Sequence, residues 1–390
     1  MTDRTAQRRH ACARIDLEAI RSNVEALRGR AADGAAVMAV VKADGYGHGL
    51  VPSARAAVAG GATWLGTALL DEALALRAAG LTEPRVLAWL IGPGERLTEA
   101  VTADIDLSVN AGWALEEIVA AAGSVGRPAR VHLKIDTGLG RGGATSGDWP
   151  ELVAAARRAQ AGGAVQVVGV WSHFAYADAP GHDTIKRQAV AFDEAVRVAE
   201  RSGLELEVRH LANSAATLTA PELHYDLVRP GLAVYGLSPV PDVGGPADFG
   251  LRPAMTLTSG LVLVKRVPAG QGVSYGHGYV TDQETTLGLV PLGYADGIPR
   301  SATSVGPVLA ARRRRTVAGR VCMDQFVLDL GDDPATAGEE VVLFGPGDAG
   351  EPTAEDWAAA TGTIAYEIVT RIGPRVPRAY VGGLPEVVPA

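Results

Sequence analysis

Short apolar segments alternate with Ala-rich segments of helical period over the first 240 residues of the chain. Continuous apolar strands separated by helices are typical of a parallel sheet that is covered on both faces. Strands are predicted over 35–41, 62–67, 85–91, 105–109, 131–136, 165–172, 206–211 and 226–231. Helices are predicted over 71–79, 95–103, 114–122, 149–161 and 184–201.

Eight such βα units in about 230 residues match the size of a closed (β/α)8 barrel of the TIM type. A doubly wound open sheet is the alternative, but no Gly-rich dinucleotide turn follows any of the predicted strands. We therefore predict an α/β fold that begins with a barrel domain over residues 12–240.

The composition of the sequence changes at 238–246, where Pro and Gly residues indicate a linker. Beyond it, the segments become β-branched and alternating, which predicts an all-β domain of short strands. These strands are expected over 256–267, 286–292, 316–330 and 340–344, with helices over 354–361 and 365–371. We predict a mostly-β C-terminal domain over residues 241–390, with residues 1–14 packed against it.

Composition excludes several classes of protein. A net charge of −8 argues against binding to nucleic acid or to an anionic membrane surface. The cluster Arg312–Arg315 is expected to form a solvated loop or a sheet edge. Two cysteines and no long apolar segment or secretory signal favour a cytoplasmic protein with no disulfide framework. No metal site is predicted.

A lysine stands at the end of the first predicted strand. Lys42 follows the apolar run 35–41, and the glycines after it predict an open loop before the next helix. Ligands and catalytic groups of parallel α/β folds gather at this end of the strands. A lone lysine here also occurs simply because its amine reaches water. However, the chain has only four lysines among its 36 basic residues, and burial can turn a lysine into a nucleophile.

Polar residues that a core would not select recur where the later barrel strands end. Each one also has an ordinary structural explanation, such as a turn cap or a buried ion pair. Since all fall on one rim of the predicted barrel, a shared site is the better interpretation. These residues are Lys42, Tyr46, Lys134, Asp136, Arg141, His173, Asn213, Ser214 and Arg229.

The chemical types of these residues suit a ligand that combines a phosphate with an aromatic ring. Ser214 and the backbone N–H groups of Gly231 and Leu232 suit a phosphate, together with tyrosine hydroxyls. A lysine amine opposite a phosphate site suggests pyridoxal 5′-phosphate. His173 and Arg229 are then expected to bracket its pyridine ring.

From about Arg14 to its C-terminus, the chain resembles the alanine racemases of the fold-type III pyridoxal-phosphate family. The matching motifs are Val41–Gly49, Asp136–Arg141, Ser172–Phe174, Asn213–Ala215, Arg229–Gly231, Ser274–Gly276, Gly293–Gly297 and Cys322–Asp324. A weaker relative is the barrel-only pyridoxal-phosphate-binding protein, which shares the first motif but has no β domain. One departure is Pro230, where the family often has a larger apolar residue.

The resemblance implies a role for each matching residue. It implies that Lys42 carries the cofactor and is the base on the D face, and that Tyr275 of a partner subunit is the base on the L face. Arg229 is implied to pair with the pyridine nitrogen. The other implied cofactor contacts are Tyr46, His173, Asn213, Ser214, Gly231, Leu232 and Tyr366.

Further roles are implied for the substrate. Arg141 and the Met323 backbone are implied to contact its carboxylate, with Cys322 and Asp324 beside them. Lys134 matches a carbamylated lysine of the family that orients this arginine, although an ion pair with Asp136 or another nearby acid is the alternative. The substrate entryway is implied to comprise Tyr294, Tyr366, Arg300 and Arg320.

Racemisation requires an α-proton to leave one face of the substrate and return on the other. A lysine amine and a tyrosine phenol both have a pKa of about 10 in water, so the site must lower both. We hypothesise a chain of contacts from Tyr275 through His173 to Arg229. Because arginine stays charged, Arg229 is expected to donate a hydrogen bond and not a proton to the ring nitrogen, which suppresses transamination.

The resemblance thus implies a homodimeric isomerase that interconverts L- and D-alanine and supplies D-alanine for peptidoglycan. A racemase of serine, or of a broader set of small amino acids, is a close alternative. A non-catalytic carrier of pyridoxal phosphate is an alternative of another class. Tyr275 argues against a carrier, since holding a cofactor needs no second base.

Overall fold

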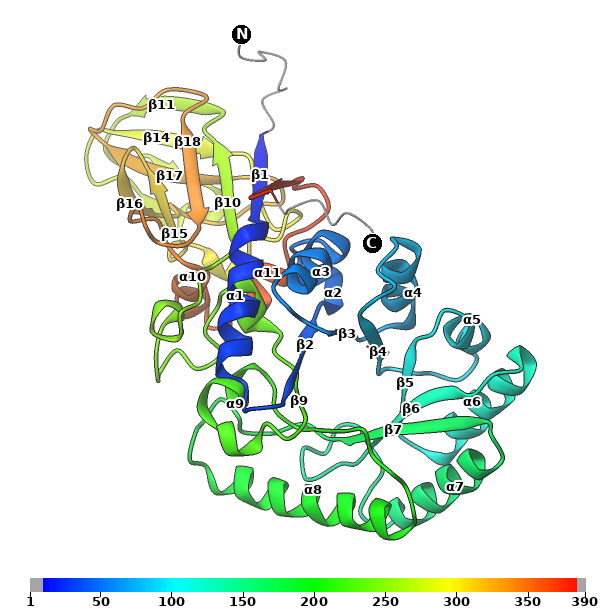
Figure 1. Ribbon diagram of the computed structural model, residues 1–390. Helices are drawn as coiled ribbons and strands as arrows, with labels where there is room; N and C mark the ends of the chain where they lie inside the picture. The colour runs from blue at the N-terminus through cyan, green and yellow to red at the C-terminus, as the bar shows by residue number, and fades with distance from the viewer. Residues whose placement is uncertain (1–9, 384–390) are drawn as a thin grey trace. The chain divides into compact units, whose positions relative to one another are not determined.

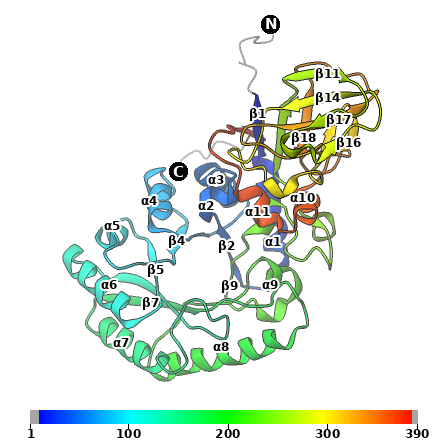
Figure 2. The ribbon, with the colours of Figure 1, turned by 180° about the vertical axis from the view of Figure 1, so that it is seen from behind.

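The structure is a computed structural model that describes residues 10–383. The chain divides into two units, which Figures 1 and 2 show from opposite sides. The barrel unit comprises Ile20–Gly45 and Gly49–Leu251. The C-terminal unit comprises Tyr46–His48 and Arg252–Ala390, with the N-terminal residues up to Ala19. Of the segment 1–14 that was predicted to pack with the C-terminal domain, residues 1–9 lie outside the described part.

Within residues 10–383, one parallel sheet of eight strands forms the centre of the barrel unit. The strands are β2 (Ala36–Val40), β3 (Trp64–Thr67), β4 (Arg85–Ala88), β5 (Asp106–Val109), β6 (Ala129–Lys134), β7 (Val165–Trp171), β8 (Val208–His210) and β9 (Leu227–Val228). Their order is β8-β7-β6-β5-β4-β3-β2-β9, so the last strand pairs with the first.

Hydrogen bonds between β8 and β9 complete the closure of this sheet. The N–H of Asp226 donates to the carbonyl of Arg209 at 3.1 Å, and the N–H of Arg229 donates to the carbonyl of Ala212 at 2.9 Å. The predicted (β/α)8 barrel is therefore confirmed.

Helices run around the outside of the barrel sheet, as Figure 1 shows for α4 to α8. The helices of this part of the chain are α1 (Leu17–Arg30), α2 (Lys42–Tyr46), α3 (Leu50–Ala59), α4 (Leu70–Ala78), α5 (Leu97–Thr102), α6 (Gly112–Val125), α7 (Trp149–Ala161), α8 (Asp183–Arg201) and α9 (Ser214–Thr219). Short 3-10 helices follow at η1 (Pro221–Leu223), η2 (Leu232–Tyr235) and η3 (Pro246–Phe249).

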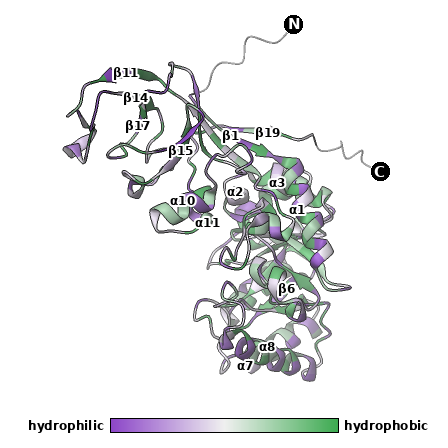
Figure 3. Ribbon diagram, turned by 90° about the vertical axis from the view of Figure 1, so that its left-hand side faces the viewer, coloured by the Kyte–Doolittle hydropathy of each residue, from purple (hydrophilic) through white to green (hydrophobic). Residues whose placement is uncertain are grey.

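Apolar residues at helical spacing explain how these helices pack. On α8, Phe192, Val196 and Ala199 are buried, whereas Val190 is 66% exposed. Figure 3 shows hydrophilic residues along α7 and α8. A helix with one apolar face and one charged face is stable only when the apolar face is covered. The five helices predicted from periodicity are confirmed, within a few residues at their ends.

The interior of the barrel is mostly apolar. A cluster of buried side chains from six strands fills it: Met38, Trp64, Leu87, Val168, Val208 and Leu227. Polar side chains are nevertheless completely buried on the same sheet, among them the titratable residues Asp106, His132 and His210. Buried polar groups of this kind persist only when hydrogen bonds satisfy them.

The C-terminal unit contains a sheet of six strands, a sheet of three and the two-stranded pair β12-β13, counted over the residues that the structure describes. The larger sheet has the order β16-β15-β18-β10-β1-β19 and the smaller one the order β11-β14-β17. The strands are β1 (Ala11–Asp16), β10 (Met255–Gly260), β11 (Leu263–Val267), β12 (Gly272–Val273), β13 (Tyr279–Val280), β14 (Thr285–Val290), β15 (Pro307–Ala310), β16 (Arg313–Thr316), β17 (Phe326–Gly331), β18 (Glu340–Phe344) and β19 (Arg378–Val381).

Helical segments of this unit are α10 (Ala354–Thr361), α11 (Ala365–Thr370) and the 3-10 helices η4 (Tyr275–His277) and η5 (Arg300–Ala302). The two predicted α-helices are thus confirmed, as is the mostly-β character of the unit. Most of the basic cluster Arg312–Arg315 lies on β16, the predicted sheet edge. There Arg314 pairs with Asp356 at 2.9 Å.

Two strand predictions in this unit are wrong. The segment 256–267 is not one strand, because its hydrogen-bond partner changes: Leu261 donates to the carbonyl of Glu339, and Val262 donates to that of Leu289. β10 and β11 therefore belong to different sheets. The segment 316–330 is also interrupted, since Gly319 adopts a φ of 79° and β17 begins only at Phe326.

Over residues 10–383, no helix combines the length and the apolar character that a membrane crossing requires.

Replacement of Phe192 by alanine tests the packing of α8 on the barrel. Because this side chain is fully buried, Phe192→Ala is expected to lower the free energy of unfolding by about 3–5 kcal/mol. Val190→Ala on the exposed face of the same helix is the control, with an expected change within about 0.5 kcal/mol. Urea unfolding followed by circular dichroism measures both, and equal losses would contradict the assigned faces.

Candidate active site

The backbone after Lys42 forms a left-handed turn, where the sequence predicted an open loop. Ala43, Asp44 and Tyr46 have φ values of 54°, 52° and 52°, and Gly45 lies between them at 61°. Each non-glycine residue in this region costs about 1–2 kcal/mol. The N–H of Leu50 donates to the carboxylate of Asp44 at 2.7 Å, which helps to hold the turn. Strain of this kind concentrates at functional sites.

Five of the predicted site residues in the barrel unit act on one another electrostatically. Burial lowers the pKa of Lys42, and the charge of Arg141 lowers it further, against the opposing effect of Glu72. Loss of hydration and then the charges of four cations keep the pKa of His173 well below its usual range; these cations are Arg229, Arg141, Lys134 and Lys42. The strand ends therefore gather these groups at one rim, as the sequence predicted.

Two tryptophans lie under the cations of this rim. The amine of Lys42 is 5.8 Å from the centre of the Trp89 ring, and that of Lys134 is 4.3 Å from the Trp171 ring. Burial lowers the pKa of Lys134 to about 8, with further contributions from Arg229 and Arg141. A substantial fraction of this amine is therefore neutral near physiological pH.

The carboxylate of Asp136 organises the loop that carries Arg141. It accepts hydrogen bonds from four consecutive backbone N–H groups, those of Gly138, Leu139, Gly140 and Arg141, at 2.9–3.2 Å. Although burial raises the pKa of Asp136, these bonds lower it overall. Its charge is thus directed at the loop backbone, and Arg141 itself is exposed.

Arg229 is held from several directions. Its guanidinium donates to the carbonyls of Ser172 at 2.8 Å and Leu211 at 3.3 Å. It also contacts Nδ1 of His210 at 3.2 Å and Nδ1 of His173 at 3.4 Å. Burial lowers the pKa of Arg229 to about 9, so the group remains a cation at neutral pH. It keeps further N–H groups for a ligand, because a guanidinium has five.

Donors for an anion lie at the start of α9 and η2. The hydroxyl oxygen of Ser214 accepts from the N–H of Gly231 at 2.7 Å and from that of Ala233 at 3.3 Å. Its own proton is therefore left to donate. Asn213 caps α9 by accepting from the N–H of Ala216 at 3.1 Å. Ser214, Gly231 and Leu232 are buried, so an anion here would bind donors that water does not fully hydrate.

The C-terminal unit presents Tyr275 on a strained loop. This side chain is 71% exposed. Around it, Ser274, Gly276 and His277 have φ values of 60°, 73° and 48°. The hydroxyl of Ser274 donates to the carbonyl of Arg320 at 2.8 Å, which ties the loop to another predicted site residue. The loop thus presents the tyrosine side chain to the outside of the unit.

Tyr294, Cys322 and Met323 belong to two loops that touch. The N–H of Tyr294 donates to the carbonyl of Cys322 at 3.1 Å, and the N–H of Ala295 donates to that of Met323 at 3.0 Å. This approach requires glycine at position 293, where a Cβ would lie 2.3 Å from both carbonyl oxygens. Tyr294 and Met323 remain about half exposed.

Arg375 joins these loops and was not predicted from the sequence. Its guanidinium contacts Asp296 at 3.0 Å and the predicted residue Asp324 at 2.7 Å. Asp296 is buried and in turn accepts from the N–H of Gly293 at 2.9 Å. Arg300 is exposed on η5.

Tyr46 and Tyr366 form an aromatic pair in the C-terminal unit. Their ring centres lie 6.1 Å apart at 44°. Burial raises the pKa of Tyr46, and Tyr366 raises it further, so this phenol is a hydrogen-bond donor and not an anion.

Comparisons with known proteins match both parts of the chain. Residues 15–239 match the family model of the alanine racemase N-terminal domain, and residues 254–380 match that of the alanine racemase C-terminal domain. The chain belongs to the alanine racemase family.

Individual members of this family are similar over their full length. The alanine racemase of Frankia casuarinae is 67% identical over 95% of this chain and 96% of its own. The solved structure of the alanine racemase from Streptomyces coelicolor superposes with a TM-score of 0.95 at 64% identity, covering 96% of this chain and 98% of its own. That of Bacillus anthracis with bound L-Ala-P has a TM-score of 0.86 at 34% identity, over 96% and 95%.

Sequence reasoning missed the residues under Arg229. His132 and His210 lie on β6 and β8 and are fully buried, and Trp171 ends β7. One signal was available, namely a histidine inside each of two strands predicted for the barrel sheet, His132 in 131–136 and His210 in 206–211. Among residues 10–383, no group of His, Cys, Asp and Glu is arranged to hold a metal ion.

Replacement of Gly293 by alanine tests the contact between the two loops of the C-terminal unit. The added Cβ must push against two backbone oxygens, so Gly293→Ala is expected to cost about 1–3 kcal/mol of stability. Gly278→Ala is the control, because no heavy atom lies within 4 Å of its Cβ position. Thermal unfolding of both variants measures the difference, and a neutral Gly293→Ala would show that the loops are not in this contact.

Proposed function

We propose that the chain interconverts L-alanine and D-alanine with pyridoxal 5′-phosphate held on Lys42, using Lys42 and Tyr275 as the two bases. The reaction is supported by membership of the alanine racemase family over nearly the whole chain. The observation that carries the assignment to residues is the partly buried amine of Lys42, whose pKa is lowered by loss of hydration and then by the charge of Arg141. Since D-alanine is a component of peptidoglycan, supply of the cell wall is the role that follows.

The donors of the barrel rim fit this cofactor. Lys42 offers an amine for the aldehyde, and Arg229 offers N–H groups for the ring nitrogen, which is an acceptor. The free proton of the Ser214 hydroxyl suits the phosphate, as does the N–H of Leu232 at the start of η2, with Asn213 holding the same turn. The N–H of Gly231, which the sequence also assigned to the phosphate, instead donates to Ser214. When bound, pyridoxal 5′-phosphate supplies an electron sink that makes the α-proton of an amino acid acidic.

Two bases on opposite faces allow racemisation without rotation of the substrate. We assign Nζ of Lys42 to the D face and the phenolic oxygen of Tyr275 to the L face. In one direction Tyr275 takes the α-proton and Lys42 returns one; in the other direction the roles are exchanged. The lowered pKa of Lys42 supports this assignment, because a base with a pKa nearer to neutrality is available more of the time.

Arg229 favours return of the proton to the α-carbon. It donates to the ring nitrogen and, with its pKa lowered only to about 9, keeps its own protons at neutral pH. The ring is then a weaker electron sink than one beside a carboxylate, and transamination is suppressed. His173 accepts from Arg229 at Nδ1, which leaves Nε2 to carry a proton in the proposed chain towards Tyr275.

Tyr275 is proposed to act in the site of a second copy of the chain. Its 71% exposure on a loop stiffened by positive φ values supports this, because an exposed and rigid tyrosine is suited to enter another molecule's site. The proposed assembly is a cytoplasmic homodimer with shared active sites.

The substrate carboxylate is assigned to Arg141 and the backbone of Met323. Arg141 is exposed on a loop whose backbone Asp136 fixes, so it is free to bind an anion. Tyr366 is proposed to contact the phosphate with Tyr46, and Tyr294, Arg300 and Arg320 to line the substrate entryway.

Exchange of the α-proton with solvent tests the proposal directly. The holoenzyme in D2O is expected to deuterate the α-carbon of both L- and D-alanine, as NMR measures. Tyr275→Phe should abolish exchange from L-alanine far more than from D-alanine, whereas Tyr380→Phe, another exposed tyrosine, should change neither. Equal loss on both isomers would overturn the face assignment.

The same experiment separates the alternatives. Serine exchanged as fast as alanine would indicate a racemase of broader specificity. Cofactor binding with no exchange of any small amino acid would indicate a carrier.

Lys134 is proposed to carry a carbamate that orients Arg141. Its neutral amine attacks carbon dioxide, an N–C bond forms and a proton leaves, so a cation becomes an anion. The pKa of about 8 supports this step, because only the neutral amine reacts. The anion would also offset the crowd of positive charge around it.

Carbon-13 NMR tests this modification. After incubation with ¹³C-bicarbonate, a carbamate signal is expected that grows as the pH rises through about 8, because more of the amine is then neutral. Lys134→Ala should lose the signal, and Lys186→Ala should retain it. A signal that survives Lys134→Ala would place the modification elsewhere.

A further inference from the structure

A row of polar side chains crosses the interior of the barrel unit. Oδ2 of Asp106 lies 3.0 Å from Nε2 of His132, and Nδ1 of His132 lies 2.9 Å from Nε2 of His210. Nδ1 of His210 then lies 3.2 Å from a terminal nitrogen of Arg229. All four side chains are at most 5% exposed. Asp106 begins β5 and Arg229 follows β9, so the row runs from one end of the barrel to the other.

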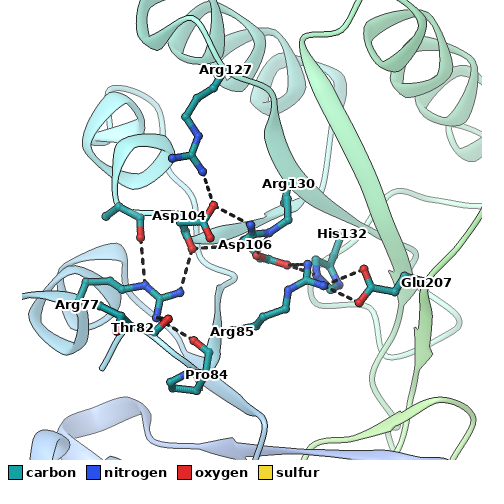
Figure 4. A network of polar contacts seen from close by, with 11 residues as sticks. Arg77, Thr82, Pro84, Arg85, Asp104, Asp106, Arg127, Arg130, His132 and Glu207 are labelled. Carbon is teal, nitrogen blue, oxygen red and sulfur yellow. Dashed lines mark hydrogen bonds and ion pairs between the residues drawn. The ribbon is translucent and has the colours of Figure 1, made fainter. Parts of the chain in front are cut away.

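The Asp106 end of this row is an anion. Arg85 and Arg130 each contact one of its two carboxylate oxygens, as Figure 4 shows. Although burial raises the pKa of Asp106, the hydrogen bond from His132 and the charges of His132, Arg85 and Arg130 lower it overall. A carboxylate in this state only accepts hydrogen bonds.

The two ends of the row decide where the protons lie between them. Because Asp106 only accepts, Nε2 of His132 must carry a proton. Because Arg229 only donates, Nδ1 of His210 must carry none. The bond between the rings then has one consistent arrangement, in which Nε2–H of His210 donates to Nδ1 of His132. A further proton on either ring would set two donors face to face.

Packing fixes the rings, so that only the protons are free to change. The ring of His210 stacks on Trp171 with an interplanar angle of 1°, and Arg229 lies 4.9 Å from the centre of the same tryptophan. His132 stands edge-on to Trp64 at 89°. Because the rings are held in this way, loss of the acceptor at Asp106 would change the tautomers of His132 and His210 and not their positions.

We propose that Asp106 is a positioning residue for Arg229, acting through His132 and His210 to set the direction of the hydrogen bonds that hold the guanidinium. The row makes His210 an acceptor towards Arg229, so the guanidinium is drawn onto it and aimed at the rim. The inference rests on the proposed function in that Arg229 contacts the ring nitrogen of the cofactor. Asp106 lies at the end of the barrel opposite to the rim, which explains why no motif of the site includes it.

Asp106→Asn and Asp104→Asn form a matched pair for the test. Asp104 lies in the same cluster and binds Arg130 at 2.7 Å, whereas the carboxylate that His132 contacts is that of Asp106 (Figure 4). Both variants remove one carboxylate from the same group of arginines. Only Asp106→Asn replaces the acceptor of His132 by an amide that is able to donate.

The measurement is NMR of the chain carrying ¹⁵N-labelled histidine and loaded with pyridoxal 5′-phosphate, combined with kinetics on alanine. In the unmodified chain, His132 and His210 are both expected as neutral Nε2–H tautomers. Asp106→Asn is expected to change these tautomers, to lower kcat and cofactor affinity by about 10- to 100-fold, and to change KM for alanine by less than about two-fold. Asp104→Asn should leave the tautomers of both histidines unchanged and should keep kcat, cofactor affinity and KM for alanine within about two-fold of the unmodified chain.

Two results would overturn the proposal. One is a proton on Nδ1 of His210 in the unmodified chain, which needs no variant to observe and so survives a failure of Asp106→Asn to fold. The other is an Asp106→Asn variant with changed tautomers whose kcat and cofactor affinity equal those of Asp104→Asn. A chain that binds the cofactor but does not racemise alanine would refute the proposed function. The histidine tautomers and the cofactor affinity of the two variants would still test the role of Asp106 in that case.

Discussion

Closure of the eight-stranded sheet is the constraint on which the barrel site depends. β9 pairs with β2, so Arg229 and Lys42, which come from opposite ends of this part of the sequence, follow neighbouring strands. The C-terminal ends of parallel strands meet at one rim, and the polar residues that end the strands are collected there. An open sheet with the same strands would leave these two residues at opposite edges.

The rim that closure creates is crowded with positive charge. Lys42, Lys134, Arg141 and Arg229 act on one another or on His173, and the nearby carboxylate of Asp136 is occupied by backbone N–H groups. Cations in a poorly hydrated place are costly unless anions join them. A phosphate and a substrate carboxylate would provide that compensation, so the crowding of positive charge at the rim favours their binding.

The C-terminal unit places its functional residues differently. Tyr275, Tyr294 and Met323 lie in connections between strands, where glycines and positive φ values shape the backbone. Such connections carry function because a rigid scaffold presents them. The scaffold here is the pair of sheets, and the contact of Gly293 with the carbonyls of Cys322 and Met323 is what brings two connections together. Strand prediction failed at these places because a strand-like composition over 316–330 conceals the turn at Gly319.

Local pattern determined a large share of this protein in advance. The apolar run 35–41 indicates a strand that is buried on both faces, and the spacing of Phe192 and Val196 indicates which face of α8 is buried. Such patterns are visible in the sequence because each depends on only a few neighbouring residues. The motifs around Lys42 and Arg141 likewise indicated the family and the rim.

Tertiary structure alone decided what depends on residues far apart in sequence. The assignment of β10 and β11 to different sheets and the row from Asp106 to Arg229 both arise from such contacts. A histidine in a buried strand indicates that it needs a hydrogen-bond partner, but only the tertiary structure identifies that partner as Asp106 for His132 and Arg229 for His210. The physical reason is that periodicity encodes the direction of a side chain, whereas hydrogen bonding requires the position of its partner.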